Sequence, residues 1–196
     1  MNIRRGTAAD ADAVTETIAT AFHDDPVWSW AFPDERARPA QYTRWWRLFV
    51  DAALRDGWVW VTADCEAIAM WIEPGVAELN DDAIAQIWPL LQEIAPERAA
   101  VIVKMLRRFE DNHPHAEGHY YLSFVATHTD HRGQGIGVKL LEHNLALIDA
   151  KGVPAYLESS NPRNEPRYEL LGWQSIGSFN AADDGPPLTQ MWRPAR

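Results

Sequence analysis

The chain has little of three features that mark particular classes of protein. Its one cysteine, Cys65, excludes an internal disulfide and fits a reducing compartment, so we expect a cytoplasmic protein. No apolar run approaches the ~18 residues of a membrane span and no signal-peptide pattern opens the chain, so we expect no membrane partner. Basic residues are also few, with 18 Lys and Arg against 28 Asp and Glu, and the formal charge of −10 argues against a nucleic-acid partner.

Length and composition are those of an ordinary globular protein. The 196 residues suffice for one well-buried core and are few for two, so we expect a single domain over residues 1–196. The 46% hydrophobic and 23% charged residues fit that expectation. The negative charge is compatible with a cationic substrate, and solubility alone explains it equally well.

The most informative stretch predicts a strand, a glycine-rich turn and a helix. Residues 119–143 read HYYLSFVATHTDHRGQGIGVKLLEH. Aromatic and β-branched residues over 120–125 predict a core strand, and apolar residues recur at helical spacing over 138–148. Three glycines lie between them: Gly133, Gly135 and Gly137. Because the first turn of a helix has free amides and the positive end of the dipole, this turn, with Arg132 beside it, predicts a diphosphate site.

The glycine spacing distinguishes between kinds of phosphate-binding loop. A dinucleotide-binding turn requires G-x-G-x-x-G, but Val138 stands where the third glycine should be. A Walker A loop requires G-x-x-x-x-G-K-[ST], which is absent. The pattern R-x-x-G-x-G, formed by Arg132, Gly135 and Gly137, resembles the acetyl-CoA pyrophosphate loop of the GNAT N-acyltransferase superfamily. On this stretch alone, an ordinary strand, turn and helix without a ligand stays open.

A second stretch resembles the closing half of the same fold. From Ala155 to Trp173 the chain reads AYLESSNPRNEPRYELLGW, which gives a short strand, a polar break and a short helix. In the GNAT superfamily this strand splays from its neighbour, and a loop with Asn leads into a helix that carries Tyr. The wording of the two stretches looks most like the puromycin N-acetyltransferase-like branch.

The resemblance implies acetyl-CoA as co-substrate. Loop amides would bind its pyrophosphate, and the strand before the loop would pair with its pantetheine. The implied cofactor-binding residues are Val125, Ala126, Thr127, Arg132, Gly133, Gln134, Gly135, Ile136, Gly137, Val138 and Asn161. No metal is implied.

Acyl transfer requires a polarised thioester carbonyl, a neutral amine and a proton for the leaving thiolate. The resemblance places the Tyr168 hydroxyl near the sulfur, which makes it the candidate acid, against the alternative of a core tyrosine. Glu158, on the strand beside the splay, is the candidate base, against a structural carboxylate or deprotonation through water. Tyr121 stands where histone-type members carry their base Glu, which favours a small-molecule acceptor.

The acceptor side is expected near residues 22–35, FHDDPVWSWAFPDE, an aromatic segment broken by two prolines between two predicted helices. The candidates for an apolar wall are Trp28, Trp30 and Phe32, with Asp24 or Asp25 for the amine. Aromatic packing between the helices is the equal alternative.

The predicted fold is α/β (α+β): a mixed, mostly antiparallel, GNAT-like central sheet flanked by helices and splayed at strands 4 and 5. Further strands are expected at 2–5, 58–61, 67–72, 174–179 and 188–193, and helices after Thr7 and at 41–54, 81–94 and 96–110. The last two helices are the least GNAT-like part. His113, His115 and His119 are expected in a surface turn rather than around a metal.

The sequence therefore predicts an N-acetyltransferase that moves the acetyl group of acetyl-CoA to a small-molecule amine, aromatic or cationic, as a monomer or homodimer. Three alternatives stay open: a peptide or protein N-terminal acetyltransferase, a non-catalytic acyl-CoA sensor and, least favoured, a nucleotide-dependent dehydrogenase.

Overall fold

A computed structural model describes residues 1–115 and 118–196. Seven strands form one sheet in the order β1-β2-β3-β4-β5-β7-β6. The strands are β1 Ile3–Arg5, β2 Trp58–Thr62, β3 Ala67–Ile72, β4 Tyr120–Thr127, β5 Ala155–Ser159, β6 Gln174–Asn180 and β7 Pro187–Arg193. All neighbouring strands are antiparallel except β4 and β5. The predicted mixed, mostly antiparallel sheet is confirmed.

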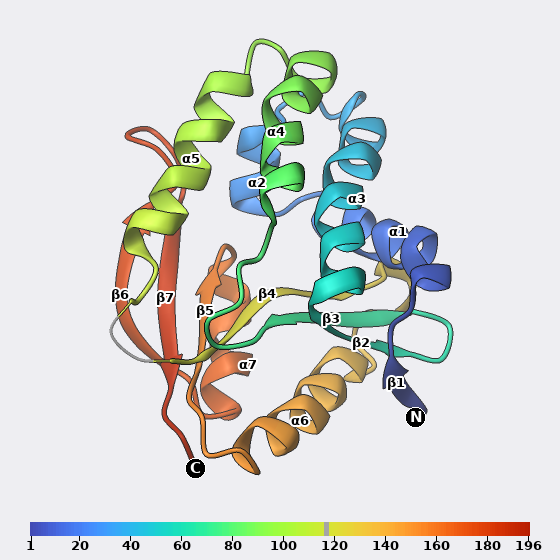
Figure 1. Cartoon of the computed structure of the whole chain (residues 1–196), viewed down its shortest axis with the longest axis vertical. Coiled ribbons are helices and arrows are strands. Elements are labelled where there is room, and N and C mark those ends of the chain that lie inside the picture. Colours follow the sequence, from blue (N-terminus) through green and yellow to red (C-terminus); the bar gives the residue numbers. More distant parts are fainter. Residues whose placement is uncertain (116–117) are drawn as a thin grey trace.

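Helices cover both faces of the sheet. They are α1 Ala11–Ala21, α2 Pro26–Ala31, α3 Arg38–Asp56, α4 Asp81–Ile94, α5 Ala99–Asn112, α6 Ile136–Asp149 and α7 Glu165–Leu170. In Figure 1, α1 and α3 lie above β2–β4 and α6 lies below them. Because β3 is covered on both faces, all six of its residues are buried.

Each face has its own core. The upper core joins α1–α5 to the sheet around an aromatic cluster that includes Trp28, Trp45, Trp46 and Phe124. The lower core packs α6 against Trp71, Leu122 and their neighbours. A buried hydrogen bond from Trp71 Nε1 to Asn144 Oδ1 (3.0 Å) ties α6 to β3.

The two central strands separate after a short contact. β4 and β5 pair in parallel only at Tyr120 with Ala155 and Tyr121 with Tyr156, although both strands continue beyond. Beyond this contact β5 pairs along its full length with β7 on its other edge. Figure 1 shows the result, with β2–β4 running across the view and β5–β7 running along it. The predicted splay between the fourth and fifth strands is thus present.

A β-bulge lies where the splay begins. Met70 of β3 is opposite Phe124, whereas the next residue, Trp71, is opposite Leu122, so Ser123 is the extra residue of β4. A bulge bends its strand and changes which face the following side chains reach. Leu122 accordingly belongs to the lower core and Phe124 to the upper one.

The element boundaries differ from expectation in one important place. The aromatic segment expected to be irregular contains α2, which begins at Pro26. Asp25 caps this helix by accepting from Val27 N (3.0 Å) and Trp28 N (3.2 Å). Asp at the cap followed by Pro at the first position is a standard helix start, so the signal was in the sequence. No helix in the described part of the chain is long and apolar enough to span a membrane.

Candidate functional site

The gap between β4 and β5 exposes backbone groups of β4. In an antiparallel pair, the N–H and C=O groups of alternate residues point to the same neighbouring strand. His128 N donates to Glu66 O (2.8 Å), on the side of β3. Counting back from His128, Val125 and Thr127 turn their backbone groups away from β3, toward the gap. They are therefore available to a thioester or an amide-bearing ligand, whereas Ala126 between them faces β3.

The glycine-rich turn enters α6 in a left-handed conformation. Gly133 has φ +79° and Gly135, the N-cap of α6, has φ +72°. Residues with a side chain avoid this region, so these two positions favour glycine for the path of the chain. The first turn of α6 contains no acidic side chain, so its free amides and dipole are left for an anion.

Gly137 is required for a different reason. A Cβ built at this position would lie 2.6 Å from Thr127 Oγ1, closer than any real contact. The absence of a side chain lets the start of α6 pack directly on the end of β4. The loop, the helix start and the exposed strand amides are thereby held as one unit.

Arg132 is exposed and anchors the turn to another element. Its Nη2 donates to Ala21 O (2.6 Å), at the carboxyl end of α1. A cation at the end of a helix is stabilised by the dipole, so this contact orients the loop. The guanidinium has further donors, and the residue lies next to the glycine turn, as a pyrophosphate-binding role requires.

The loop after β5 carries a second group of polar contacts. Asn161 Oδ1 accepts from Arg163 N (3.1 Å) and caps a short 3-10 helix. Ser160 Oγ donates to Asp25 Oδ2 (2.6 Å), which joins this loop to the start of α2. Asn161 is therefore held at the gap by its own backbone turn.

The structure separates the two aspartates that the sequence left as alternatives. The Asp24 side chain is 87% exposed, and its Oδ1 lies 4.0 Å from His23 Nε2. Asp25 is buried, and burial is the main cause that raises the pKa of its carboxyl. Asp25, rather than Asp24, faces the interior near Tyr168, whose pKa its charge helps to raise.

Tyr168 lies on α7, partly buried against the lower core. Its ring packs edge-on to Trp173, with 5.8 Å between centroids. Burial, followed by the nearby Asp25 charge, raises the pKa of its hydroxyl well above 10. The hydroxyl therefore keeps its proton at neutral pH, as a proton donor must, and it has no hydrogen-bond partner among the described residues.

Glu158 lies on β5, on the upper face beside the gap. Its side chain is only 2% exposed, and its carboxylate has no well-formed hydrogen bond in the described part of the chain, although the Tyr121 and Tyr156 hydroxyls interact with it. Tyr121 and Tyr156 are close enough that the Glu158 charge adds to burial in raising the pKa of both hydroxyls. His113 Nδ1 lies 3.7 Å from Glu158 Oε1.

A second carboxylate faces the same place. Glu78, in the loop between β3 and α4, hydrogen-bonds Ser123, the bulge residue of β4. Burial and the charge of Glu158 raise the pKa of Glu78 to about 7. Sequence reasoning missed Glu78, because nothing in the loop EPGVAELN marks one glutamate over the other.

The histidine prediction was wrong for two of the three residues. His115 is exposed, but His119 is buried and His113 is half-buried between Tyr121 and Tyr156. His113 Nε2 and His119 Nε2 lie 3.0 Å apart. They turn inward because the end of α5 and the start of β4 meet over β5. Among residues 1–115 and 118–196, no three His, Cys, Asp or Glu side chains are grouped as metal ligands.

The aromatic residues proposed for the acceptor wall are mostly in the core. Trp28 is 7% exposed and stacks on Phe109, and Phe32 is fully buried. Trp30 is partly exposed, with the Arg98 guanidinium 4.6 Å from its ring centroid. For Trp28 and Phe32 the alternative, packing between helices, therefore holds.

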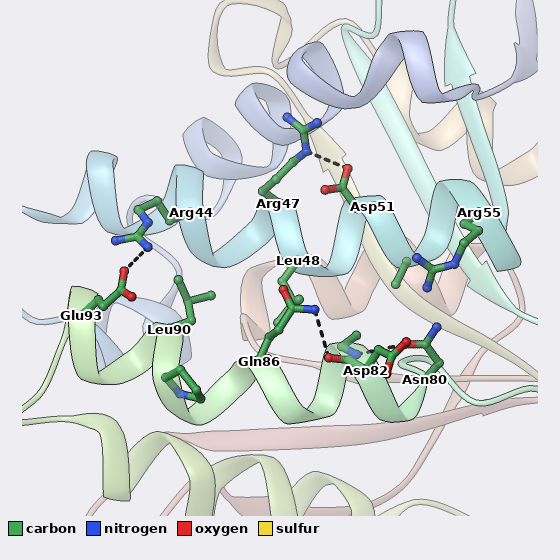
Figure 2. Close-up of a pocket in the computed structure, with 13 residues that line it drawn as sticks. Arg44, Arg47, Leu48, Asp51, Arg55, Asn80, Asp82, Gln86, Leu90 and Glu93 are labelled. Atoms are coloured by element: carbon green, nitrogen blue, oxygen red, sulfur yellow. Dashed lines mark hydrogen bonds and ion pairs between the residues drawn. The ribbon is translucent and has the colours of Figure 1, made fainter.

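A hollow of about 490 Å³ lies elsewhere, between α3 and α4 (Figure 2). Its rim is charged, with an Arg44–Glu93 ion pair and an Arg47–Asp51 pair at 2.7 Å. None of the residues at the β4–β5 gap line it. It is an ion-paired seam between two helices rather than part of the gap.

The seven-stranded sheet with a gap between β4 and β5 is the fold that the sequence predicted for an acetyltransferase. The model of the Acetyltransferase (GNAT) family matches residues 20–173. The chain therefore belongs to the GNAT family of acetyltransferases, whose members use acetyl-CoA.

Individual relatives are similar over most of their length. An uncharacterised N-acetyltransferase of Schizosaccharomyces pombe is 27% identical over 183 residues, which cover 88% of this chain and 74% of that protein. A histone acetyltransferase-related acetyltransferase of Corynebacterium glutamicum has a TM-score of 0.75 at 27% identity, over 100% of this chain and 96% of that one. Arylalkylamine N-acetyltransferase 2 of Aedes aegypti has a TM-score of 0.61 at 17% identity, with both chains fully covered, and shares the fold.

Proposed function

We propose that this protein transfers the acetyl group of acetyl-CoA to the amine of a small molecule, by direct attack in a ternary complex. The observation that carries this proposal is the gap between β4 and β5. One of its sides holds free strand amides, the glycine turn and the start of α6. The other side holds a buried carboxylate, Glu158, which has no well-formed hydrogen bond in the described part of the chain.

The cofactor side binds and orients. Val125 and Thr127 offer backbone groups to pantetheine and to the thioester oxygen, and Arg132 with the first turn of α6 offers positive charge to the pyrophosphate. Gly133 to Val138 and Asn161 are expected along the same path, whereas Ala126 turns its backbone groups to β3 and its side chain into the upper core. Acetyl-CoA supplies the activated acetyl group.

Proton movements are assigned to two side chains. The ammonium of the acceptor loses one proton to Glu158, and its nitrogen then forms the C–N bond as the C–S bond breaks. Tyr168 gives its proton to the departing sulfur and regains one from the nitrogen, which becomes the amide. The proton on Glu158 leaves by way of His113, whose side chain is 26% exposed.

A small acceptor is favoured over a peptide. A peptide acceptor would need an open groove between the acceptor wall and the final hairpin. Arg108 of α5 instead pairs with Asp183 in the turn between β6 and β7, and Gln190 Nε2 of β7 donates to Asn112 O at 2.7 Å. These contacts fasten α5 onto the hairpin. Tyr121 stands where histone-type members carry their base Glu, and this also favours a small-molecule acceptor. The resemblance to the puromycin N-acetyltransferase-like branch favours it as well.

The test is thiol release from acetyl-CoA, followed with a thiol reagent, across puromycin, kanamycin, spermidine, tryptamine and short peptides. We expect release that depends on small amines and a new amide in the product. Release with peptides only would replace this proposal by the N-terminal acetyltransferase. Acetyl-CoA binding by calorimetry without release from any amine would favour the acyl-CoA sensor.

A further inference from the structure

Glu78 and Glu158 reach the acceptor side of the gap from different segments: Glu78 Oε1 accepts from the Ser123 hydroxyl, and Glu158 Oε1 lies 3.7 Å from Nδ1 of His113, whose ring centroid is 4.8 Å from that of Tyr121 on the same strand as Ser123. Glu158 comes from β5, and Glu78 hangs from the loop before α4 and holds the bulge residue Ser123. The Glu158 side chain is 2% exposed, and burial is the largest cause that raises the pKa of Glu78, so both carboxylates are largely removed from water. The two charges are close enough for Glu158 to raise the pKa of Glu78.

The described residues supply no fixed cation to this pair. Buried charges in proteins are normally paired, because an uncompensated one is costly to remove from water. No lysine or arginine in residues 1–115 and 118–196 forms an ion pair with either carboxylate, and the groups that face them are Tyr121, Tyr156, Ser123 and His113. A site of this kind is complementary to a cation that arrives with a ligand.

We propose that Glu78 and Glu158 together bind the ammonium group of the acceptor, and that the acceptors are cationic amines with no carboxylate beside the amine. This inference rests on the proposed acetyl transfer and names its substrate class. Glu158 then receives the proton, whereas Glu78 is a binding residue that selects the charge of the acceptor.

The chemistry of the site explains both the binding of an ammonium group and the exclusion of acceptors with a carboxylate beside the amine. An ammonium has three donors and forms charge-assisted hydrogen bonds with carboxylates. The rings of Tyr121 and Tyr156, whose centroids lie 5.9 Å apart, pack beside the same carboxylate, and aromatic rings favour a nearby cation. An α-carboxylate would bring a third negative charge against the pair, and like charges in a partly dry site oppose binding strongly.

The experiment compares matched amines that differ only by the carboxylate. Acetyl transfer to tryptamine and tryptophan, and to agmatine and arginine, is measured with the wild type, with Glu78→Gln and with Glu73→Gln. We expect the wild type to prefer each decarboxylated amine by about 100-fold or more in kcat/KM. Glu78→Gln should reduce this preference about tenfold, because it removes one of the two charges.

Glu73→Gln is the matched control. It makes the same change in the same loop, but Glu73 Oε1 accepts from Tyr120 OH (2.8 Å) and lies 3.4 Å from Lys151 Nζ. The preference of the Glu73→Gln variant for the decarboxylated amines over the amino acids should equal that of the wild type. An unchanged preference in Glu78→Gln, or the same loss in Glu73→Gln, would overturn the inference while leaving the proposed transfer intact.

A binding measurement separates this inference from the transfer reaction. The melting temperature with CoA present is recorded with and without tryptamine or agmatine. Stabilisation of the wild type that is lost in Glu78→Gln supports the ammonium site even where no amine is acetylated, in which case the proposed transfer is what fails. No stabilisation of the wild type by either amine, or equal stabilisation by tryptophan, would refute the site.

Discussion

The two sides of the β4–β5 gap are built in different ways. The cofactor side comes from one continuous segment, the end of β4, the glycine turn and the start of α6. Its geometry depends on backbone conformations, such as φ +72° at Gly135, and on one close contact between Gly137 and Thr127. The acceptor side is assembled from four separate segments, which contribute Glu78, Ser123, Glu158 and His113.

Because of this difference, the cofactor side can bind a ligand common to many proteins, whereas the acceptor side determines which amine is accepted. A local segment of backbone can bind the same diphosphate and pantetheine in many proteins, since its contacts are to main-chain groups. A site assembled from side chains of distant segments can change one residue at a time without disturbing the fold. Variants on the two sides should therefore affect different kinetic parameters.

The largest effect is expected for Glu158→Gln on the acceptor side. The change keeps the shape of the side chain and removes its ability to accept the proton. We expect kcat/KM for the amine to fall about 100-fold or more. Acetyl-CoA affinity, measured by calorimetry, should stay within a factor of about two, since Glu158 is not among the residues proposed to contact acetyl-CoA.

The control for this variant is its pH profile. If Glu158 is the base, the remaining rate should rise with pH as more of the amine becomes neutral in solution. If Glu158→Gln at pH 7 has a rate close to that of the wild type, the amine is deprotonated through water. The acceptor side would then contribute no base.

Tyr168→Phe tests the point where the two sides meet. Only the hydroxyl is lost, so packing against Trp173 should persist. We expect kcat to fall at least about tenfold, with the affinity for acetyl-CoA nearly unchanged. With the same amine but a thioester of a more acidic thiol, the variant should lose less of its kcat. The thiolate of a more acidic thiol leaves without needing a proton from Tyr168. Equal rates for wild type and variant would exclude Tyr168 as the acid.

The two sides were also unequally predictable from the sequence. The cofactor turn was found because glycine spacing, an arginine and the following helical pattern lie within a few residues of each other. Glu158 could be proposed from its strand, but Glu78 could not, because the contact of Glu78 depends on a bulge at Ser123 and on loops that meet only in the folded chain. The inward turn of His113 and His119 was missed for the same reason.

Short elements and buried positions account for the remaining differences. The two prolines around α2 obscured a helix whose cap, Asp25, was itself visible in the sequence. From the sequence alone, an aromatic segment near a predicted site can either line that site or pack in the core. In the structure Trp28 and Phe32 are buried, which shows that they pack in the core. Strands and long helices were predicted well because their apolar periodicity extends over many residues.

Gly137→Ala changes the cofactor side alone. The added methyl group meets Thr127 Oγ1 at 2.6 Å, and threonine has few rotamers with which to move away. We expect the start of α6 to shift and the KM for acetyl-CoA to rise about tenfold, equivalent to about 1.4 kcal/mol, within the range of overpacking costs. The KM for the amine should not change.

The double variant Gly137→Ala with Thr127→Ala provides the control. It removes the clashing oxygen and keeps the backbone group of residue 127, so acetyl-CoA affinity should recover most of its loss. A double variant as weak as Gly137→Ala alone would show that the helix start itself, rather than its contact with β4, requires glycine.

The smallest expected effect is on stability, and it compares two glutamates of one loop. The pKa of Glu78 is raised to about 7, so folding takes up a proton between about pH 4.5 and pH 7, and the ionised group costs stability above that range. The pKa of Glu73 is lowered by its hydrogen bond from Tyr120 and by Lys151, so its charge stabilises the fold above its ordinary pKa and is lost in acid.

The melting temperatures of the two variants from pH 4 to pH 8 should therefore move in opposite directions relative to the wild type. Glu78→Gln should gain a few degrees as pH rises, and Glu73→Gln should lose a smaller amount. Parallel pH curves for the two variants would mean that Glu78 is neither buried nor beside another negative charge, and the acidic acceptor side would lose its physical basis.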